Sequence, residues 1–178
     1  NRITAEISPV ERGAHMRFSF PANAPAYLVL DGYTGMSGVK IFPEERKITG
    51  YVSNARFAPG NFCNYFVIVF DQPFTGSGTW ENINNTVSEN SRNAEGKGTG
   101  AFVRFRNGAK VQARIASSYT SAEQAELTWQ KELGGSRTFE QTKAAANKIW
   151  NGLFNRVLVE RGSDADRGTF YSCLFWAN

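Results

Sequence analysis

The dipeptide Asn107-Gly108 is the sequence feature that most constrains the fold of this 178-residue chain. It separates two runs in which apolar and polar residues alternate, 101–106 and 110–117. Alternation with a period of two is typical of a β-strand that buries one face, and Asn-Gly accepts the positive φ angles of a tight turn. The pattern therefore predicts a β-hairpin in which the two runs pair as antiparallel strands.

Further strand-like runs fill the first two thirds of the chain. Residues 65–70 are apolar throughout, which is typical of a central strand covered on both faces. The other runs are separated by turn residues and cover 3–8, 14–20, 26–31, 39–42 and 47–53. This spacing predicts a mainly β fold, an antiparallel β-sandwich over residues 1–118. The polar stretch 82–100, rich in Asn, Ser and Gly, is expected to be a long loop.

Residues 119–178 show helical periodicity instead, so we expect two or three helices appended to the C-terminal side of the sandwich. A capping box at Thr120 or Ser121 opens the first helix, and Gly134-Gly135 ends it. Thr138 with Gln141 opens a second helix. A third helical segment begins at Asp164 or Asp166, after a possible short strand over 157–160.

Composition excludes several classes of function. A net charge of +4, with no Gly-rich phosphate loop and no aromatic RNA-binding pattern, argues against a nucleic-acid partner. No run of 18 apolar residues occurs, so no membrane-spanning helix is expected. Cys63 and Cys173 exclude a disulfide framework and a zinc site built on cysteine alone, and leave either one bridge or two free thiols.

The titratable residues give no catalytic pair from the sequence alone. A glycosidase needs two carboxyl groups facing each other across a sugar. The acidic residues that draw attention all have an ordinary role in turns or at a helix start, and they are Asp31, Glu44, Glu45, Asp71, Asp164 and Asp166. We therefore predict no catalytic residue and no metal ligand in this chain. The only histidine, His15, is expected to be a surface residue that faces away from Met16 and Phe18.

Basic and aromatic side chains are the remaining candidates for binding. Arg104, Arg106, Lys110 and Arg114 fall on the predicted hairpin, where they form either an anion site or a solvated sheet face. Trp129 and Trp150 fit the apolar stripes of helices and are expected in the core. Trp80 follows a Gly-rich segment and is expected to be exposed.

Several blocks, in order, resemble the N-terminal domain of glycoside hydrolase family 92, the calcium-dependent exo-α-mannosidases. The chain stops near the start of the family's catalytic region, and residues 170–178 show no helix stop signal, so we expect a piece of a longer protein. The blocks are Ile3-Thr4-Ala5-Glu6-Ile7, residues 12–21 (RGAHMRFSFP), residues 65–74 (YFVIVFDQPF), residues 121–125 (SAEQA), residues 145–153 with Trp150-Asn151, and residues 169–175 (TFYSCLF).

The resemblance implies a β-sandwich of the galactose-mutarotase-like kind, whose helices over 119–178 lead to an (α/α)6 catalytic domain outside this chain. It implies inverting hydrolysis of terminal α-mannosides of glycans, with calcium bound by residues outside this chain. The chain would supply scaffold and part of the pocket wall, and carbohydrate contacts would fall on Trp80, Tyr171 and Trp176. The family's polar His after the Leu-Tyr pair is Trp176 here. Export to the periplasm, the cell surface or the medium of a bacterium is also implied.

Two other functions stay open from the sequence. A stand-alone carbohydrate-binding sandwich would have measurable affinity for sugars and exposed aromatic residues on one sheet. A structural or interaction domain without a ligand would use the apolar end near Phe175 as its docking surface.

Overall fold

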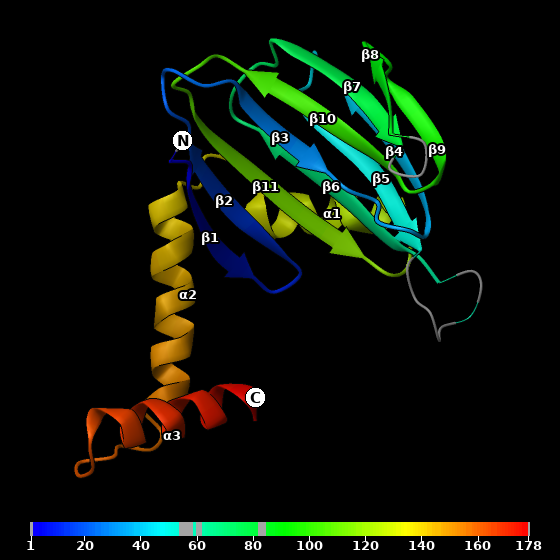
Figure 1. Ribbon diagram of the computed structural model, residues 1–178. Coiled ribbons are helices and arrows are strands. Elements are labelled where there is room, and N and C mark those ends of the chain that lie inside the picture. The colour runs from blue at the N-terminus through cyan, green and yellow to red at the C-terminus, as the bar shows by residue number, and fades with distance from the viewer. Residues whose placement is uncertain (1, 54–58, 60–61, 82–84, 178) are drawn as a thin grey trace.

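Two antiparallel sheets make up most of the molecule, which is known from a computed structural model that describes residues 2–53, 59, 62–81 and 85–177 (Figure 1). The larger sheet has seven strands in the order β1-β2-β11-β6-β5-β4-β9. Their bounds are β1 Thr4–Val10, β2 Gly13–Ser19, β11 Lys110–Ser118, β6 Asn64–Phe70, β5 Lys47–Ser53, β4 Met36–Phe42 and β9 Asn93–Lys97. The four-stranded sheet has the order β3-β10-β7-β8, with β3 Ala26–Leu30, β10 Thr99–Phe105, β7 Gly76–Glu81 and β8 Thr86–Glu89.

The main core lies between the two sheets. Alternate residues of β10 and β11 point into it, among them Val103, Phe105 and Val111, which are at most 4% exposed. Phe66, Ile68 and Phe70 of β6 come from the apolar run and are also buried there. Burial of aromatic and branched side chains from both sheets supplies the main stabilising free energy. The prediction of a mainly β antiparallel sandwich is confirmed.

The predicted hairpin at Asn107-Gly108 is wrong. β10 pairs with β3 and β7, whereas β11 pairs with β2 and β6, so the turn carries the chain from one sheet to the other. Gly108 has the expected positive φ of 74°. Its N–H donates to the Pro21 carbonyl, 3.2 Å away, which ties the turn to a different segment. Two strands with inward apolar faces can pair by backbone hydrogen bonds in one sheet, or they can face each other across the core from two sheets. An alternating pattern does not distinguish these two arrangements.

The long loop expected over 82–100 is wrong for the part that the structure describes. Thr86–Glu89 forms β8, which pairs with β7, and Asn93–Lys97 forms β9, which pairs with β4. Both strands lie at sheet edges, and every residue of β8 is exposed. Edge strands keep their polar side chains in water, so these two lacked an apolar pattern. Residues 82–84 lie outside the described residues.

Three helices follow the sandwich, as predicted. They are α1 Ala122–Leu133, α2 Phe139–Phe154 and α3 Asp164–Trp176. Ser121 caps α1, and the predicted capping box of Thr138 with Gln141 opens α2. Ser163 caps α3 through a box with Asp166. The strand considered over 157–160 is absent. None of these helices, over their described residues, is long and apolar enough to cross a membrane.

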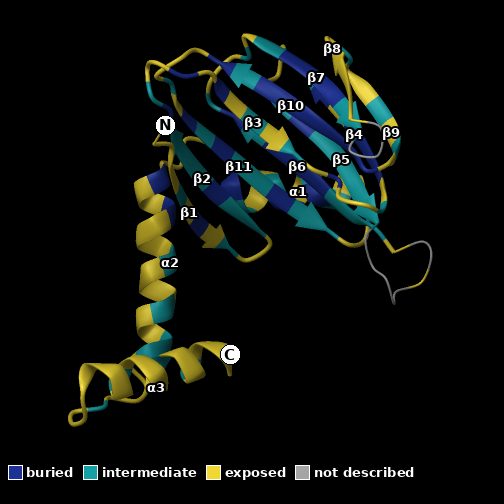
Figure 2. Cartoon of the chain, viewed as in Figure 1, coloured by how far each residue is buried: buried dark blue, intermediate teal, exposed yellow. Residues whose placement is uncertain are grey.

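The helices differ in how closely they attach to the sandwich. α1 lies along the outer face of the seven-stranded sheet, where Leu133 and Trp129 pack on Val67 and Ala116 in a second apolar cluster. α2 packs on β1 and β2, and its buried residues, Phe139 and Thr142, lie at its start. Its far end projects away and carries α3, which has no buried residue (Figures 1 and 2).

Candidate functional site

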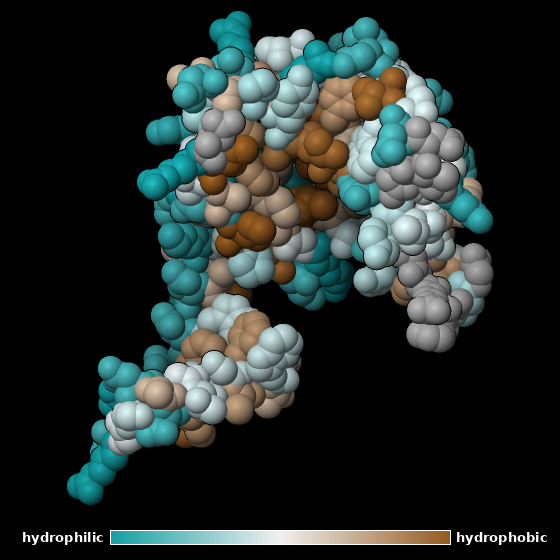
Figure 3. All heavy atoms as spheres, viewed as in Figure 1, coloured by the Kyte–Doolittle hydropathy of each residue, from teal (hydrophilic) through white to brown (hydrophobic). Residues whose placement is uncertain are grey.

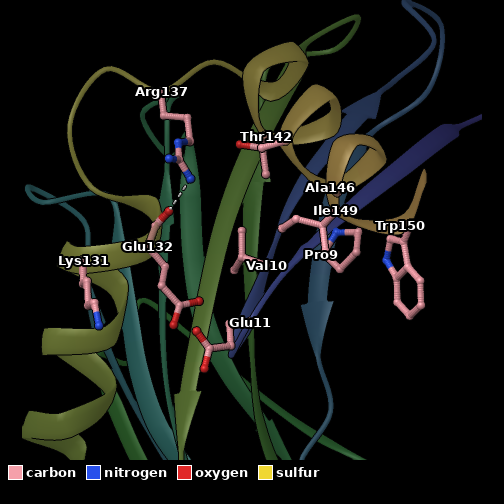
Figure 4. Close-up of a pocket in the computed structure, with 11 residues that line it drawn as sticks. Pro9, Val10, Glu11, Lys131, Glu132, Arg137, Thr142, Ala146, Ile149 and Trp150 are labelled. Carbon is pink, nitrogen blue, oxygen red and sulfur yellow. Dashed lines mark hydrogen bonds between the residues drawn. The ribbon is translucent and has the colours of Figure 1, made fainter. Parts of the chain in front are cut away.

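A cleft of about 530 Å³ lies where α2 leaves the sandwich (Figure 4). Pro9, Val10 and Glu11 line it from the end of β1 and the β1–β2 turn. The last turn of α1, Arg137 and one face of α2 complete the lining, with Lys131, Glu132, Thr142, Ala145, Ala146, Ile149 and Trp150. Most of the wall is apolar, and within it Ile149 of α2 is 65% exposed.

The charged groups at the rim of this cleft are held by local contacts. The Arg12 backbone N–H donates to Glu132 Oε2, 3.0 Å away, and Arg12 Nη2 donates to Glu11 Oε1 at 3.1 Å. Arg137 Nη1 donates to the Glu132 carbonyl at 3.0 Å, the contact that Figure 4 shows as a dashed line. The two carboxylates therefore organise the turn beside the cleft. An apolar cleft with such a rim is suited to docking protein rather than to hydrolysis.

His15 is fully buried, so the prediction of a surface histidine is wrong. It does face away from the core, but α2 covers that face of β2. Its Nδ1 lies 3.2 Å from Thr142 Oγ1, and its ring meets Phe139 edge-on at a centroid distance of 5.4 Å. No local pattern indicates that a helix 127 residues further along the chain covers this strand. The period-two pattern reports which residues share a face and not what covers that face.

The hydrogen bonds of Thr142 assign the tautomer of His15. The Thr142 hydroxyl donates to the Thr138 carbonyl, 3.2 Å away, so it accepts from the Nδ1–H of His15. The Nε2 atom is then unprotonated, and it is buried without a hydrogen-bond partner among the described residues. Burial lowers the pKa of His15, and the positive charge of the nearby Arg114 lowers it further.

Arg17 of β2 links the first turn of α2 to the seven-stranded sheet. Its guanidinium donates to both carboxylate oxygens of Glu6, at 2.7 and 2.9 Å, and to Glu140 Oε1 at 2.8 Å. The same group lies over the Phe139 ring, 4.3 Å from its centroid. Arg17 lowers the pKa of the Glu6 carboxyl through this hydrogen bond. A strand pair and a helix are thereby joined through one side chain.

The basic residues of the predicted hairpin do not form one anion site. Arg114 Nη1 donates to the carbonyls of Leu133 and Gly135, at 2.9 and 2.8 Å, and so ties the end of α1 to the seven-stranded sheet. Arg104 belongs to the other sheet, where it forms an ion pair with Glu89. The two arginines have separate structural roles because the turn between them changes sheets.

The acidic candidates have structural roles, as expected, although Asp71 and Glu44 bind residues far along the chain. Asp31 accepts from the Tyr33 N–H, and Asp71 accepts from the backbone and side chain of Gln112. The other four also have partners: Glu44 pairs with Arg92, Glu45 with Lys47, Asp164 with Arg167, and Asp166 with the N-cap residue Ser163.

Over the described residues, no group of three or more His, Cys, Asp or Glu side chains could hold a metal ion. Calcium takes six to eight oxygen ligands, so this part of the chain does not fit it. The cysteines in it, Cys63 and Cys173, are free thiols.

The three predicted carbohydrate contacts fall into two places. Trp80 is half-buried on β7, where its Nε1–H donates to the Leu30 carbonyl at 3.1 Å. Tyr171 and Trp176 lie on α3 and line one hollow of about 290 Å³ with Phe154 and Phe175. Trp176 is 84% exposed, and the hydroxyl of Tyr171 donates to the Val157 carbonyl at 3.2 Å. α3 and the four-stranded sheet lie at opposite ends of the molecule (Figure 1).

Of the two tryptophans expected in the core, Trp129 packs in an apolar cluster and Trp150 does not enter the sandwich. Trp129 packs in the cluster beneath α1, and its Nε1–H donates to the Arg114 carbonyl at 3.2 Å. Trp150 is half-buried, stacks on Phe154 at a centroid distance of 5.7 Å and meets Phe175 in a tilted arrangement at 4.6 Å. It therefore joins α2 to α3 and lines the cleft instead of entering the sandwich.

A groove on the outer face of the four-stranded sheet was missed from the sequence. Its lining residues are Tyr27, Val29, Trp80, Val87, Glu89, Phe102 and Arg104. Of these residues, Trp80 and Arg104 were singled out from the sequence, and they were assigned to two unrelated sites. The available signal was the set Gly76, Gly78 and Gly100 in strands that otherwise carry large side chains, but it has meaning only when the pairing of β7 with β10 is known.

Comparison with known proteins assigns the two parts of the chain. Residues 1–118 match the model of the glycosyl hydrolase family 92 N-terminal domain, and residues 124–178 match that of the family 92 catalytic domain. None of the curated proteins compared with the chain matches it significantly.

Solved structures give the same assignment. An inverting mannosidase of family GH92 from Bacteroides thetaiotaomicron VPI-5482 superposes with a TM-score of 0.89 and is 33% identical over 97% of this chain. A second family GH92 α-mannosidase from Bacteroides thetaiotaomicron has a TM-score of 0.80 and 22% identity over 97% of the chain, and this match shows the fold alone. The chain spans 24% and 25% of the lengths of these two proteins. With its sandwich matched by one domain model of the family and its helices by the other, this chain belongs to glycosyl hydrolase family 92.

Proposed function

We propose that this chain is the non-catalytic N-terminal part of an exo-α-mannosidase that removes terminal mannose from glycans. The observation that carries the proposal is the 33% identity to an inverting family GH92 mannosidase over 97% of the chain. Within the chain, the match changes from the N-terminal domain to the catalytic domain between residues 118 and 124. The sandwich would serve as scaffold, and α1 and α2 would connect it to the catalytic domain.

The exposed apolar side chains of α2 and α3 support a docking role. Ile149 is 65% exposed on α2, and Phe175 and Trp176 are 43% and 84% exposed on α3. Large apolar side chains gathered in this way are typical of a surface that another part of a protein covers. The remainder of the catalytic domain would cover this face, and Tyr171 and Trp176 would then contribute to the wall of a sugar pocket.

The chemistry would be inversion at the anomeric carbon of a terminal α-mannoside. One carboxylic acid protonates the leaving oxygen while a carboxylate activates a water on the opposite face of the sugar. The carboxylates described above have structural roles within this chain. The catalytic acid and the catalytic base would therefore come from the longer protein. Calcium would also be bound there, because the described part of this chain does not fit it. The mature protein would be exported to the periplasm or the cell surface.

The stand-alone carbohydrate-binding module is the alternative function. It is favoured less because residues 124–178, nearly all of the helical part, match a catalytic domain. A module that acts alone would not need the exposed apolar side chains of α2 and α3, among them Ile149 and Trp176.

The test is hydrolysis of α-1,2-mannobiose by the full-length protein, followed through the anomeric protons by NMR. We expect β-mannose to appear first, loss of turnover with a chelator and recovery with calcium. Residues 1–178 alone should release no mannose. Early α-mannose would overturn the inverting mechanism, and release of mannose by residues 1–178 would overturn the placement of the catalytic carboxylates outside the chain.

A further inference from the structure

The outer face of the four-stranded sheet carries an apolar groove with one ion pair. Its volume is about 320 Å³, within the range of small-ligand sites, which is about 300–1,000 Å³. Tyr27, Val29 and Val87 line it and are 42%, 61% and 59% exposed. Figure 3 shows this area as a hollow with hydrophobic side chains over β3, β10 and β7. A monomeric domain rarely exposes such a contiguous patch unless the patch has a function.

The strand register explains why this face is hollow. On the outer face, each cross-strand row of β10 and β7 pairs a large side chain with a glycine: Arg104 faces Gly76, Phe102 faces Gly78, and Trp80 faces Gly100. A Cβ atom at Gly100 would come within 2.5 Å of Trp80 Nε1, and one at Gly78 within 2.7 Å of the Phe102 ring. The rings therefore lie flat on glycine, where any other residue would push them outward.

The walls of the groove come from the neighbouring strands in the same rows. Tyr27 and Val29 of β3 pair with Arg104 and Phe102. On the other side, Val87 and Glu89 of β8 pair with Trp80 and Gly78.

The polar groups of the groove form a balanced pair. Arg104 is ion-paired with Glu89, and its guanidinium lies 5.4 Å from the Tyr27 ring centroid and 5.5 Å from that of Phe102. The Trp80 N–H is already bonded to the Leu30 carbonyl, which fixes the indole. A phosphate or an acidic peptide would be repelled by Glu89, and a cation would be repelled by Arg104.

An uncharged ligand with an apolar face and several hydroxyls fits this combination. The C–H face of a pyranose can stack on a fixed aromatic ring, and its hydroxyls can accept from a guanidinium and donate to a carboxylate. We propose that the groove bounded by Tyr27, Trp80, Arg104 and Glu89 binds an uncharged saccharide. The choice of an α-mannoside as the first probe rests on the proposed function. The proposal that the groove binds an uncharged saccharide is argued from the residues of the groove alone.

The test is saturation-transfer NMR of the chain with α-1,2-mannobiose, cellobiose, xylobiose and mannose 6-phosphate. We expect transfer to the ring C–H protons of at least one neutral disaccharide, at an affinity that salt does not change. Tyr27→Ala should weaken binding about tenfold, the equivalent of losing one aromatic contact. Because Tyr27 is 42% exposed, this variant should fold, which far-UV circular dichroism checks. Trp80→Phe, which keeps a ring but removes the larger indole, should weaken binding less.

Tyr119→Ala is the matched control, because Tyr119 is 64% exposed and stacks on Phe62 outside the groove. Its affinity should equal that of the unchanged chain. Equal losses in the two tyrosine variants, no binding of any neutral sugar, or binding of mannose 6-phosphate alone would overturn the proposal. So would a dimer seen by sedimentation that Tyr27→Ala abolishes.

The proposed saccharide site and the proposed mannosidase activity can be rejected independently of each other. Sugar binding that depends on Tyr27, in a full-length protein that releases no mannose, would keep the groove and reject the mannosidase. Mannose release without sugar binding by the chain would do the reverse.

Discussion

His15 Nδ1 lies 3.2 Å from Thr142 Oγ1, and this contact joins the outer face of the seven-stranded sheet to the first turn of α2. Both side chains are at most 1% exposed. The contact is part of a relay, since the Thr142 hydroxyl donates in turn to the Thr138 carbonyl, the residue that caps the helix. α2 belongs to the region that matches the catalytic domain. The place where this helix leaves the sandwich therefore depends on the buried Nδ1–H of His15 and the hydroxyl of Thr142.

Thr142→Val should lower the free energy of unfolding by about 1–3 kcal/mol, because it leaves the Nδ1–H of His15 buried without an acceptor. Thr142→Ser, which keeps the hydroxyl, is the control and should lose clearly less. Urea unfolding followed by circular dichroism measures both. A valine variant as stable as the unchanged chain would show that the hydrogen bond contributes nothing, and a larger loss in Thr142→Ser than in Thr142→Val would show that the methyl group matters more.

Acid should loosen this junction. The pKa of His15 is lowered from its ordinary value of 6.5, so the unfolded chain takes up the proton first as the pH falls. Stability is therefore full above about pH 6.5 and declines below it, down to the lowered pKa of the folded state. The groups that act on the imidazole are Arg17 on its own strand and, from neighbouring segments, Arg114, Gln112 and Asp71.

The measurement is simple because the chain has one histidine. An NMR titration of its imidazole resonances gives the pKa directly, and thermal unfolding between pH 5 and 7.5 gives the dependence of stability. His15→Gln should remove the pH dependence in that range. A pKa at or above 6.5, or an unchanged pH dependence in the variant, would contradict the role assigned to burial.

Local patterns predicted the elements of this fold better than their partners. The apolar run of β6 and the capping box of Thr138 with Gln141 depend on neighbours along the chain, and both predictions were confirmed. Of the two alternatives for the start of α1, Ser121 is the N-cap. The Asn107-Gly108 hairpin failed because β10 and β11 meet through Phe105 and Val111 in the core and not through backbone hydrogen bonds. His15 was placed on the correct face of its strand, but the helix that covers it lies 127 residues away.

The candidate sites show the same division. The role of Asp166 at a helix start was predicted correctly, because its partner Ser163 is three residues away. The partners of Asp71 and Glu44 lie 41 and 48 residues away, and the sequence does not indicate them. The groove depends on glycines of β7 and β10 that face large side chains of the partner strand, and the residues of each such pair are at least twenty positions apart in the chain. Edge strands β8 and β9 gave no apolar pattern because one or both of their faces remain in water.

The attachment of α1 can be tested with two leucines of the same helix. Leu133 is fully buried against Val67 and Ala116, whereas Leu127 is 57% exposed. Leu133→Ala should cost about 2–5 kcal/mol, because it removes buried methyl groups and leaves a cavity. Leu127→Ala should change stability by less than about 0.5 kcal/mol. Chemical denaturation of both variants measures the difference, and similar losses would mean that α1 does not pack on the sheet through Leu133.

The glycines of the four-stranded sheet allow a matched test of its outer face. A Cβ at Gly100 would lie 2.2 Å from the Leu30 carbonyl oxygen and 2.5 Å from Trp80 Nε1. Gly100→Ala should therefore destabilise the sheet by about 1–3 kcal/mol and displace the indole. At Gly76 the nearest atom is Arg104 Cδ at 3.4 Å, an ordinary contact.

Gly76→Ala should accordingly be neutral or stabilise by up to about 1 kcal/mol, because alanine lowers the entropy of the unfolded chain. Unfolding curves compare the two stabilities, and tryptophan fluorescence reports the position of Trp80. If Gly100→Ala were as stable as Gly76→Ala, with unchanged fluorescence, the Trp80 ring could not lie flat against Gly100, and the groove would lose the floor on which the sugar is proposed to stack.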